Sequence, residues 1–286
     1  MRTAVLAACA IAGLAVVTTT AQQPFRSQTT TVSIYATVND RDGRLAPNLA
    51  ASDFQVLDNG RPVEITVFSS EPQTITMTIL LDMSGSMMGR LLWTRDAADR
   101  LVDELRGDDR ARIGTFGTEV AISPHLTSDK ALLKRVLREE LWPGGETPLW
   151  SSIDAGMTSM TSERGRRVVL VVTDGNNTRP GIDQGDIKKR AVREEFMVYA
   201  IAINGHDLNR ELADVAAESG GGYVMVRDSE NLQAILSDVV NELRQQYVIG
   251  FTPAVLDGKQ HKLEVKMARS GLTARAPKAY MAGAPK

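Results

Sequence analysis

Five oxygen-bearing side chains of this sequence have the types and positions that a metal ion needs. They are Asp82, Ser84, Ser86, Thr147 and Asp174. The first three follow the apolar run 75–81, the fourth follows two glycines, and the last comes just after the apolar run 168–172. Carboxylate and hydroxyl oxygens without His or Cys make a hard-cation site, which favours Mg²⁺, with Mn²⁺ or Ca²⁺ as alternatives, and disfavours zinc.

The two apolar runs predict the strands that must position these side chains. Both runs are short, rich in β-branched residues and followed by small polar residues, which is typical of buried parallel strands. In a doubly wound sheet, ligands bind outside the carboxyl ends of the strands. We therefore expect the three loops to meet at one edge of a sheet.

Strand-like and helix-like segments alternate through residues 72–245, which we assign to one domain. This alternation predicts a doubly wound α/β fold, with a mostly parallel sheet and helices on both faces. Thr147 and Pro148 have the residue types of a helix N-cap and a first helical position, and they predict a helix that reaches about Thr161. Another helix is expected over 89–106, after the first candidate loop.

Shorter β segments flank this domain on both sides. Apolar residues alternate within residues 31–71, where Asn59 and Gly60 indicate a tight hairpin turn before a return strand over 63–67. Residues 246–286 return to a β pattern and end in a tail. Each flank has too few strands to be stable alone, so we expect the two to pack as one β unit, with the α/β domain inserted between them.

Residues 1–21 have the composition of a secretory signal peptide. Arg2 supplies positive charge before the apolar stretch 4–17, and cleavage is expected after Ala21. Residues 22–30 are polar, and we expect a flexible leader there. The apolar stretch is too short for a membrane span, and no later segment approaches about 18 uninterrupted apolar residues.

The cysteine content fits an exported protein, and the net charge indicates no general electrostatic partner. The one cysteine, Cys9, lies inside the signal peptide, and lipidation there is disfavoured because the apolar core continues past it. A mature chain without cysteine suits a periplasmic or secreted protein that is stabilised by its core alone. The formal net charge of −2 gives no attraction to nucleic acid or to an anionic membrane.

The stretch D-x-S-x-S that begins at Asp82, with Thr147 and Asp174 further along, resembles the metal-ion-dependent adhesion site of von Willebrand factor type A domains. The resemblance covers roughly residues 74–245, where the order of the elements agrees with that family. The flanks also resemble an exported bacterial subgroup of the family, through the Asp-Asn-Gly turn and the segment 246–251. The fold that this implies is a Rossmann-like α/β domain.

The resemblance also implies a role for each site residue. Ser84 and Ser86 bind the cation directly through their hydroxyl groups, and Thr147 binds it directly or through water. Asp82 and Asp174 act mainly through water and by orienting the hydroxyls. Neutral ligands leave the cation's charge poorly neutralised, so it can recruit an Asp or Glu of a protein partner. We therefore expect a non-enzymatic interaction module. We expect a single cation, because no pair of Asp residues follows the first loop to bind a second one.

Several alternatives stay open at this point. Ser-Gly-Ser and Asp-Gly also form ordinary turns after strands. The same cation could act as the Lewis acid of a hydrolase, although no histidine is expected near the strand ends. The chain could instead be a structural subunit of an envelope assembly. Met87 and Met88 either rim the metal site or pack under the first helix.

Overall fold

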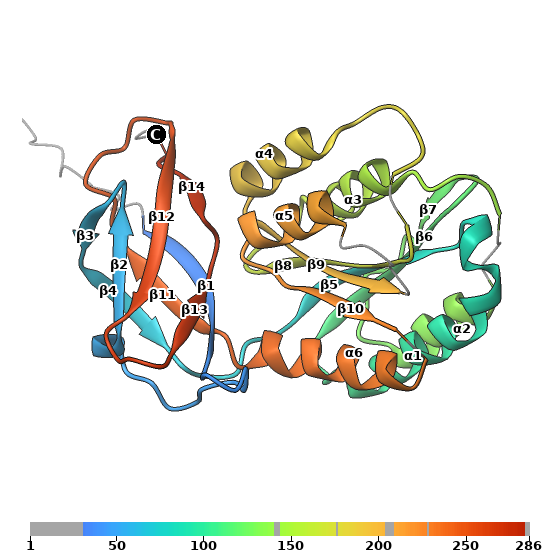
Figure 1. Cartoon of the computed structure of the whole chain (residues 1–286), viewed down its shortest axis with the longest axis horizontal. Helices are drawn as coiled ribbons and strands as arrows, with labels where there is room; N and C mark the ends of the chain where they lie inside the picture. Colours follow the sequence, from blue (N-terminus) through green and yellow to red (C-terminus); the bar gives the residue numbers. More distant parts are fainter. Residues whose placement is uncertain (1–30, 140–143, 176, 204–208, 228, 284–286) are drawn as a thin grey trace, which may run out of the picture.

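The computed structural model describes residues 31–139, 144–175, 177–203, 209–227 and 229–283. The predicted signal peptide and leader lie outside these residues. The described chain forms an α/β unit and a β unit that lie side by side, with the amino-terminal edge of the central sheet toward the β unit (Figure 1).

The α/β unit is built on a sheet with the strand order β10-β9-β8-β5-β6-β7. Its strands are β5 (Thr76–Asp82), β6 (Arg110–Phe116), β7 (Val120–Ile122), β8 (Arg167–Thr173), β9 (Phe196–Ile203) and β10 (Tyr223–Val226). Neighbouring strands pair in parallel, except that β7 runs antiparallel to β6. The predicted mostly parallel sheet is confirmed, and the edge strand β7 adds to the prediction.

Helices cover both faces of this sheet (Figure 1). One face carries α1 (Leu91–Glu104), α2 (Lys130–Glu139) and α6 (Ser229–Arg244), and the other carries α3 (Leu149–Thr158), α4 (Gln184–Glu194) and α5 (Arg210–Glu218). Each face has its own apolar core, which explains why β5 and β8 are apolar along nearly their whole length. Within the described ranges, no helix combines the length and apolar character that crossing a membrane requires.

The β unit consists of two four-stranded sheets, in the orders β13-β1-β11-β4 and β14-β12-β2-β3. Its strands are β1 (Val32–Asn39), β2 (Phe54–Asp58), β3 (Arg61–Val63), β4 (Ile65–Ser69), β11 (Tyr247–Phe251), β12 (Gln260–Met267), β13 (Thr273–Arg275) and β14 (Ala279–Met281). Each sheet combines strands from before and after the α/β unit. Both sheets contribute to one apolar core that includes Phe54, Tyr247 and Tyr280, so the two flanks do pack as one β unit.

The hairpin between β2 and β3 is confirmed, but the predicted return strand is not one strand. Asn59 and Gly60 both have positive φ angles, 48° and 80°, as the tight turn requires. After Val63 the chain leaves the sheet of β2, and from Ile65 it pairs with β11 in the other sheet. The strand is divided because the two sheets each take part of it as an edge strand.

Two predicted helix starts are corrected. Pro148, not Thr147, is the N-cap of α3, which ends at Thr158 and has no side-chain cap hydrogen bond. The helix expected over 89–106 begins as a 3₁₀ segment, η2 (Gly85–Arg90), before α1. The tight turn of η2 buries one methionine side chain and exposes the next. Met87 is fully buried in the core, whereas Met88 is 66% exposed.

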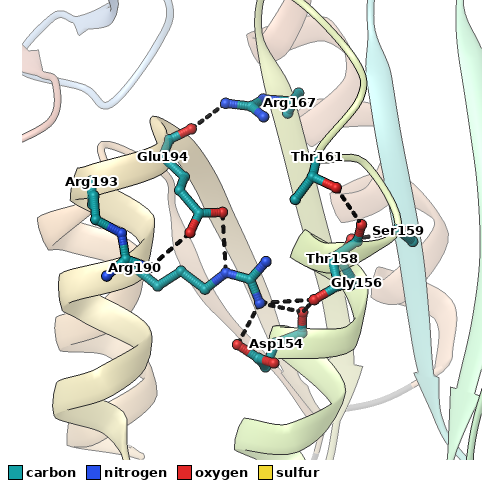
Figure 2. A network of polar contacts seen from close by, with 9 residues as sticks. All are labelled: Asp154, Gly156, Thr158, Ser159, Thr161, Arg167, Arg190, Arg193 and Glu194. Carbon is teal, nitrogen blue, oxygen red and sulfur yellow. Dashed lines mark hydrogen bonds and ion pairs between the residues drawn. The ribbon is translucent and has the colours of Figure 1, made fainter.

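An arginine network holds α3 against α4 (Figure 2). Arg190 Nη1 donates to Asp154 Oδ1 at 2.5 Å and to Thr158 Oγ1 at 2.8 Å, while Arg190 Nε donates to Glu194 Oε2 at 3.2 Å. Because α3 begins just after Thr147, this network fixes the helix that follows a candidate ligand.

Candidate metal centre

Asp82 is the last residue of β5, and it is fully buried. Its Oδ1 atom accepts a hydrogen bond from the backbone N–H of Ser84 at 2.8 Å, and its Oδ2 atom accepts one from Thr173 Oγ1 at 2.5 Å. The register of β5 and β8 places Leu81 beside Val172, which brings the next residue of each strand together. Asp82 therefore fixes the shape of the loop that follows it.

The two serine hydroxyls lie together at the mouth of this loop. Ser84 Oγ and Ser86 Oγ are 3.1 Å apart, and Ser86 Oγ donates to Asp174 Oδ1 at 2.8 Å. The Asp174 side chain is only 5% exposed. The carboxyl ends of β5 and β8 thus bring together four of the five residues that the sequence singles out.

The glycine-rich segment before Thr147 is bonded to the same loop. The backbone N–H of Gly85 donates to the carbonyl of Gly145 at 3.2 Å, and that of Gly144 donates to the carbonyl of Met83 at 2.7 Å. Gly145 has a φ of 86°, and an added Cβ atom would lie 2.5 Å from the backbone nitrogen of Thr118. Glycine is required there because any side chain would clash and strain the backbone.

Thr147 completes the cluster from a third loop. It is buried, its N–H donates to Thr178 Oγ1 at 2.8 Å, and its carbonyl accepts from the N–H of Thr178 at 3.0 Å. Its Oγ1 atom faces Gly175, beside Asp174, where an added Cβ atom would lie 3.9 Å away. Within the described part of the chain, the Thr147 hydroxyl makes no hydrogen bond, so it can bind a ligand.

Burial is the largest cause that raises the pKa of Asp82 above its ordinary value, and the nearby charge of Asp174 raises it further. Hydrogen bonds from Ser84 and Thr173 oppose this shift. Two carboxylates in a partly buried cluster repel each other, and each is poorly solvated. A cation placed between the loops would relieve both effects, because it would bring positive charge to Asp82, whose own hydrogen-bond donors are neutral.

The donor set fits a hard divalent cation. The oxygens come from three hydroxyl groups and two carboxylates, and they converge from three loops that are hydrogen-bonded to one another. Among the residues that the structure describes, no three His, Cys, Asp or Glu side chains are arranged to hold a metal ion. A metal ion at this edge therefore depends on Ser84, Ser86 and Thr147.

Three residues of the site escape the sequence reasoning. Thr173 and Thr178 bond Asp82 and Thr147, and Arg90 Nη1 lies 2.6 Å from Asp174 Oδ2. Both threonines lie within a few residues of Asp174, so the polar neighbours of a predicted ligand are the signal that could have found them. For Arg90 the only signal is its place near the serines.

Comparison with known families identifies the α/β unit. The family model of the von Willebrand factor type A domain matches residues 76–238, which is more than half of the chain. The chain belongs to the von Willebrand factor type A domain family. This is a family of protein-interaction and adhesion modules. The match covers β5 to α6, and so it includes all five candidate ligands.

Solved structures with the same fold come from distant proteins. One is proximal thread matrix protein 1 from the mussel byssus, with zinc in its metal-ion-dependent adhesion site (MIDAS) motif. It is 18% identical with a TM-score of 0.55, and the alignment covers 65% of this chain and 49% of that one. A von Willebrand factor type A protein from Catenulispora acidiphila is 13% identical with a TM-score of 0.54, covering 90% of this chain and 75% of that one.

The PilB minor pilin from Streptococcus sanguinis is 17% identical with a TM-score of 0.51, covering 62% of this chain and 63% of that one. This chain therefore spans about half the length of the mussel protein and less than two thirds of the pilin. A search of curated proteins finds no match. At these identities the likeness shows the fold alone. The Catenulispora match covers far more of the chain than the α/β unit does, so it includes strands of the β unit.

Proposed function

We propose that this von Willebrand factor type A protein is an exported, non-enzymatic interaction module. In this proposal one divalent cation, held by Ser84, Ser86 and Thr147, bridges the protein to an Asp or Glu of a protein partner. The observation that carries the proposal is the convergence of three hydroxyl groups beside two carboxylates at the carboxyl edge of the sheet.

The charge balance of the site supports a docking role. Asp82 is buried, and both of its oxygens already accept hydrogen bonds, so it orients the loop and does not bind the ion directly. The direct ligands are then neutral hydroxyls, which leave most of the charge of the dication uncompensated. A carboxylate from a partner supplies that compensation, because it brings negative charge to an open coordination position.

The identity of the cation follows from the donors. Hydroxyl and carboxylate oxygens favour Mg²⁺ over softer ions, with Mn²⁺ and Ca²⁺ as substitutes. The mussel protein with the same fold holds zinc at its MIDAS motif. We infer Mg²⁺ for this chain, and calorimetric titration with each ion tests the order.

Export is the second part of the proposal. It rests on the signal-like residues 1–21, which lie outside the described residues, and on the resemblance of the flanks to exported bacterial members of the family. The solved structures with this fold include a pilin, which is an envelope protein. Sequencing the amino terminus of the protein from the periplasm or medium should find Gln22 first. An uncleaved chain in the cytoplasm would contradict export.

The central test is cation-dependent capture. The full mature chain, immobilised, is exposed to envelope extract with Mg²⁺ or with a chelator, and captured proteins are identified. Ser84→Ala should lose both Mg²⁺ binding in calorimetry and the Mg²⁺-dependent capture, because the first direct ligand is gone. Ser52→Ala, at an exposed serine of the β unit, is the matched control and should keep both.

Two outcomes would overturn the proposal. Capture that survives the chelator would show that the cation does not bridge the partners. A Mg²⁺-dependent hydrolysis of a phosphate or ester, lost in Ser84→Ala and kept in Ser52→Ala, would make the protein an enzyme. The fold of each variant is checked by circular dichroism.

A further inference from the structure

Arg90 joins the polar cluster through Asp174 and the Ser86 carbonyl. Its Nη1 atom lies 2.6 Å from Asp174 Oδ2 and donates to the carbonyl of Ser86 at 3.1 Å. Because Asp174 Oδ1 already accepts a hydrogen bond from Ser86 Oγ, both oxygens of that carboxylate have a donor. The Arg90 side chain is 28% exposed and that of Asp174 is 5% exposed. A largely buried carboxylate of the candidate metal site is therefore paired with a guanidinium of the same chain.

Arg90 stands where two helical segments meet, as the last residue of η2 and the residue before α1. Arg90 is the N-cap residue of α1, and the first turn of that helix contains no acidic residue. The amino-terminal end of a helix carries partial positive charge, which repels a guanidinium. Asp174 and the carbonyl of Ser86 in η2 offset that repulsion and hold Arg90 at the site.

A divalent cation at the serine hydroxyls and the guanidinium would both lie beside the same carboxylate, that of Asp174. A cation bound by Ser84 and Ser86 lies beside Asp174, because Ser86 Oγ is bonded to it. Two positive charges within a few ångströms repel each other by several kcal/mol in a partly buried site. The cation therefore binds more weakly while Arg90 remains on Asp174.

We propose that Arg90 is an internal competitor of the divalent cation, and that it sets the cation affinity of the site by occupying Asp174. This inference rests on the proposed function, since it concerns the same site. It adds that loading the cation must weaken or displace the contact between Arg90 and Asp174. The affinity of the site is then set by one side chain outside the ligand set.

Titration of the purified full chain with MnCl₂ tests this inference, because Mn²⁺ binding can be measured by calorimetry without any partner. Arg90→Gln should bind Mn²⁺ about tenfold more tightly than the wild type, since it removes the competing charge. Arg90→Lys keeps the charge without the planar fork, and its affinity should lie between the two. Arg61→Gln, at an exposed arginine of β3, controls for net charge and should leave the affinity unchanged.

The opposite view is that Arg90 only braces the loop. In that case Arg90→Gln would bind Mn²⁺ as weakly as the wild type or more weakly, and the inference is wrong while the proposed function stands. If neither protein binds Mn²⁺, both fail. If only Arg90→Gln binds it, the competition is shown and the wild type does not use Mn²⁺ under those conditions. Thermal unfolding in chelator verifies that each variant is folded.

Discussion

At the amino-terminal edge of the central sheet, Arg244 Nη2 lies 2.6 Å from Asp109 Oδ2, and these side chains are 9% and 1% exposed. At the carboxyl edge, Asp82 is equally buried, but its oxygens accept from the hydroxyl group of Thr173 and the backbone N–H of Ser84, which are neutral donors. Asp109 thus has a fully charged partner, whereas Asp82 is bonded to neutral donors, and at the carboxyl edge it is the neighbouring Asp174 that pairs with a guanidinium, that of Arg90. Removing one partner of a buried ion pair leaves the other charge uncompensated and destabilises the fold, whereas a buried charge that is bonded to neutral donors gains from an added cation.

The largest effect is expected at the matched edge. Asp109 accepts from Arg244 and from the backbone N–H groups of Ile75 and Arg106, at 2.6, 2.8 and 2.7 Å. Asp109→Ala leaves a buried guanidinium without its partner and should lower the free energy of unfolding by about 3–5 kcal/mol. Chemical denaturation in chelator measures this.

The exposed neighbour Asp108 supplies the control for that variant. Asp108→Ala should change the free energy of unfolding by less than about 1 kcal/mol, since the hydrogen bond that Asp108 accepts from the Thr74 hydroxyl is at the surface. A loss below about 1 kcal/mol for Asp109→Ala as well would mean that the amino-terminal edge does not depend on its ion pair.

At the carboxyl edge, the substitution Asp82→Asn should not lower the free energy of unfolding in chelator, in contrast to Asp109→Ala at the amino-terminal edge. Because burial raises the pKa of Asp82, the folded state favours its protonated form. Without cation, the wild type should therefore lose stability relative to the variant as pH rises above about 4, the ordinary pKa, and through the raised one. At neutral pH in chelator, the variant should be at least as stable as the wild type in chemical denaturation.

Adding Mg²⁺ should reverse that order. At about one hundred times its dissociation constant, the cation should stabilise the wild type by about 2.7 kcal/mol and the Asp82→Asn variant not at all. If Asp82→Asn is less stable than the wild type in chelator, the proposed difference between the two edges is wrong. The Asp82 carboxylate would then stabilise the fold as that of Asp109 does.

Arg190, in α4, pairs with Asp154 and Glu194 (Figure 2), and its loss should cost less than that of Asp109 because these partners are partly exposed. Arg190→Gln should lower the free energy of unfolding by about 2 kcal/mol at neutral pH. Although burial raises the pKa of Glu194, hydrogen bonds from Arg193 and Arg190 outweigh it and lower that pKa. The greater stability of the wild type over Arg190→Gln is fully present above the ordinary pKa of Glu194. It should shrink as pH falls through the lowered pKa that Glu194 has in the folded state.

Denaturation curves of both proteins from neutral to acidic pH check this. Arg193→Gln, at a side chain that is 61% exposed, should cost less than about 1 kcal/mol and is the matched control. An effect of Arg190→Gln that stays constant down to acidic pH would mean that Glu194 does not contribute to it.

The smallest effect is expected for Thr178, whose hydroxyl accepts from the N–H of Thr147. Thr178→Val keeps the shape but cannot accept, so it should cost about 1 kcal/mol of stability. It should also weaken Mg²⁺ binding severalfold in calorimetry, because the third hydroxyl ligand is less well held. Thr178→Ser keeps the hydroxyl and should restore both values. Unchanged binding in Thr178→Val would place Thr147 outside the cation's reach.

Much of the α/β unit could be predicted from the sequence because its signals are local. An apolar run buried on both faces, followed by small polar residues, predicted β5 and β8 with their ends within a residue or two. The doubly wound arrangement then placed both polar loops at one edge. The Thr147 loop was assigned correctly to this edge, but Thr147 was wrongly predicted to be the N-cap of the next helix. A Thr-Pro pair is compatible with both roles, because the threonine hydroxyl can either cap a helix or face a ligand.

The β unit was harder to predict because its pairings join distant parts of the chain. β1 lies between β11 and β13, and β2 lies beside β12, contacts that span some two hundred residues. Alternation along 63–67 indicated a strand but could not show that the chain changes sheets within it. The short strands β13 and β14 exist only because the other flank offers them an edge.

By itself, the sequence determined which residues have metal-binding chemistry and which strand ends carry them, because residue type and hydrophobic pattern are properties of a short stretch of chain. Only the tertiary structure decided how those residues are connected. It bonded Asp82 to Thr173, tied Thr147 to Thr178 and placed the Arg90 guanidinium on Asp174. Such contacts depend on strand register and loop packing between residues about thirty to ninety positions apart, and no local pattern encodes them.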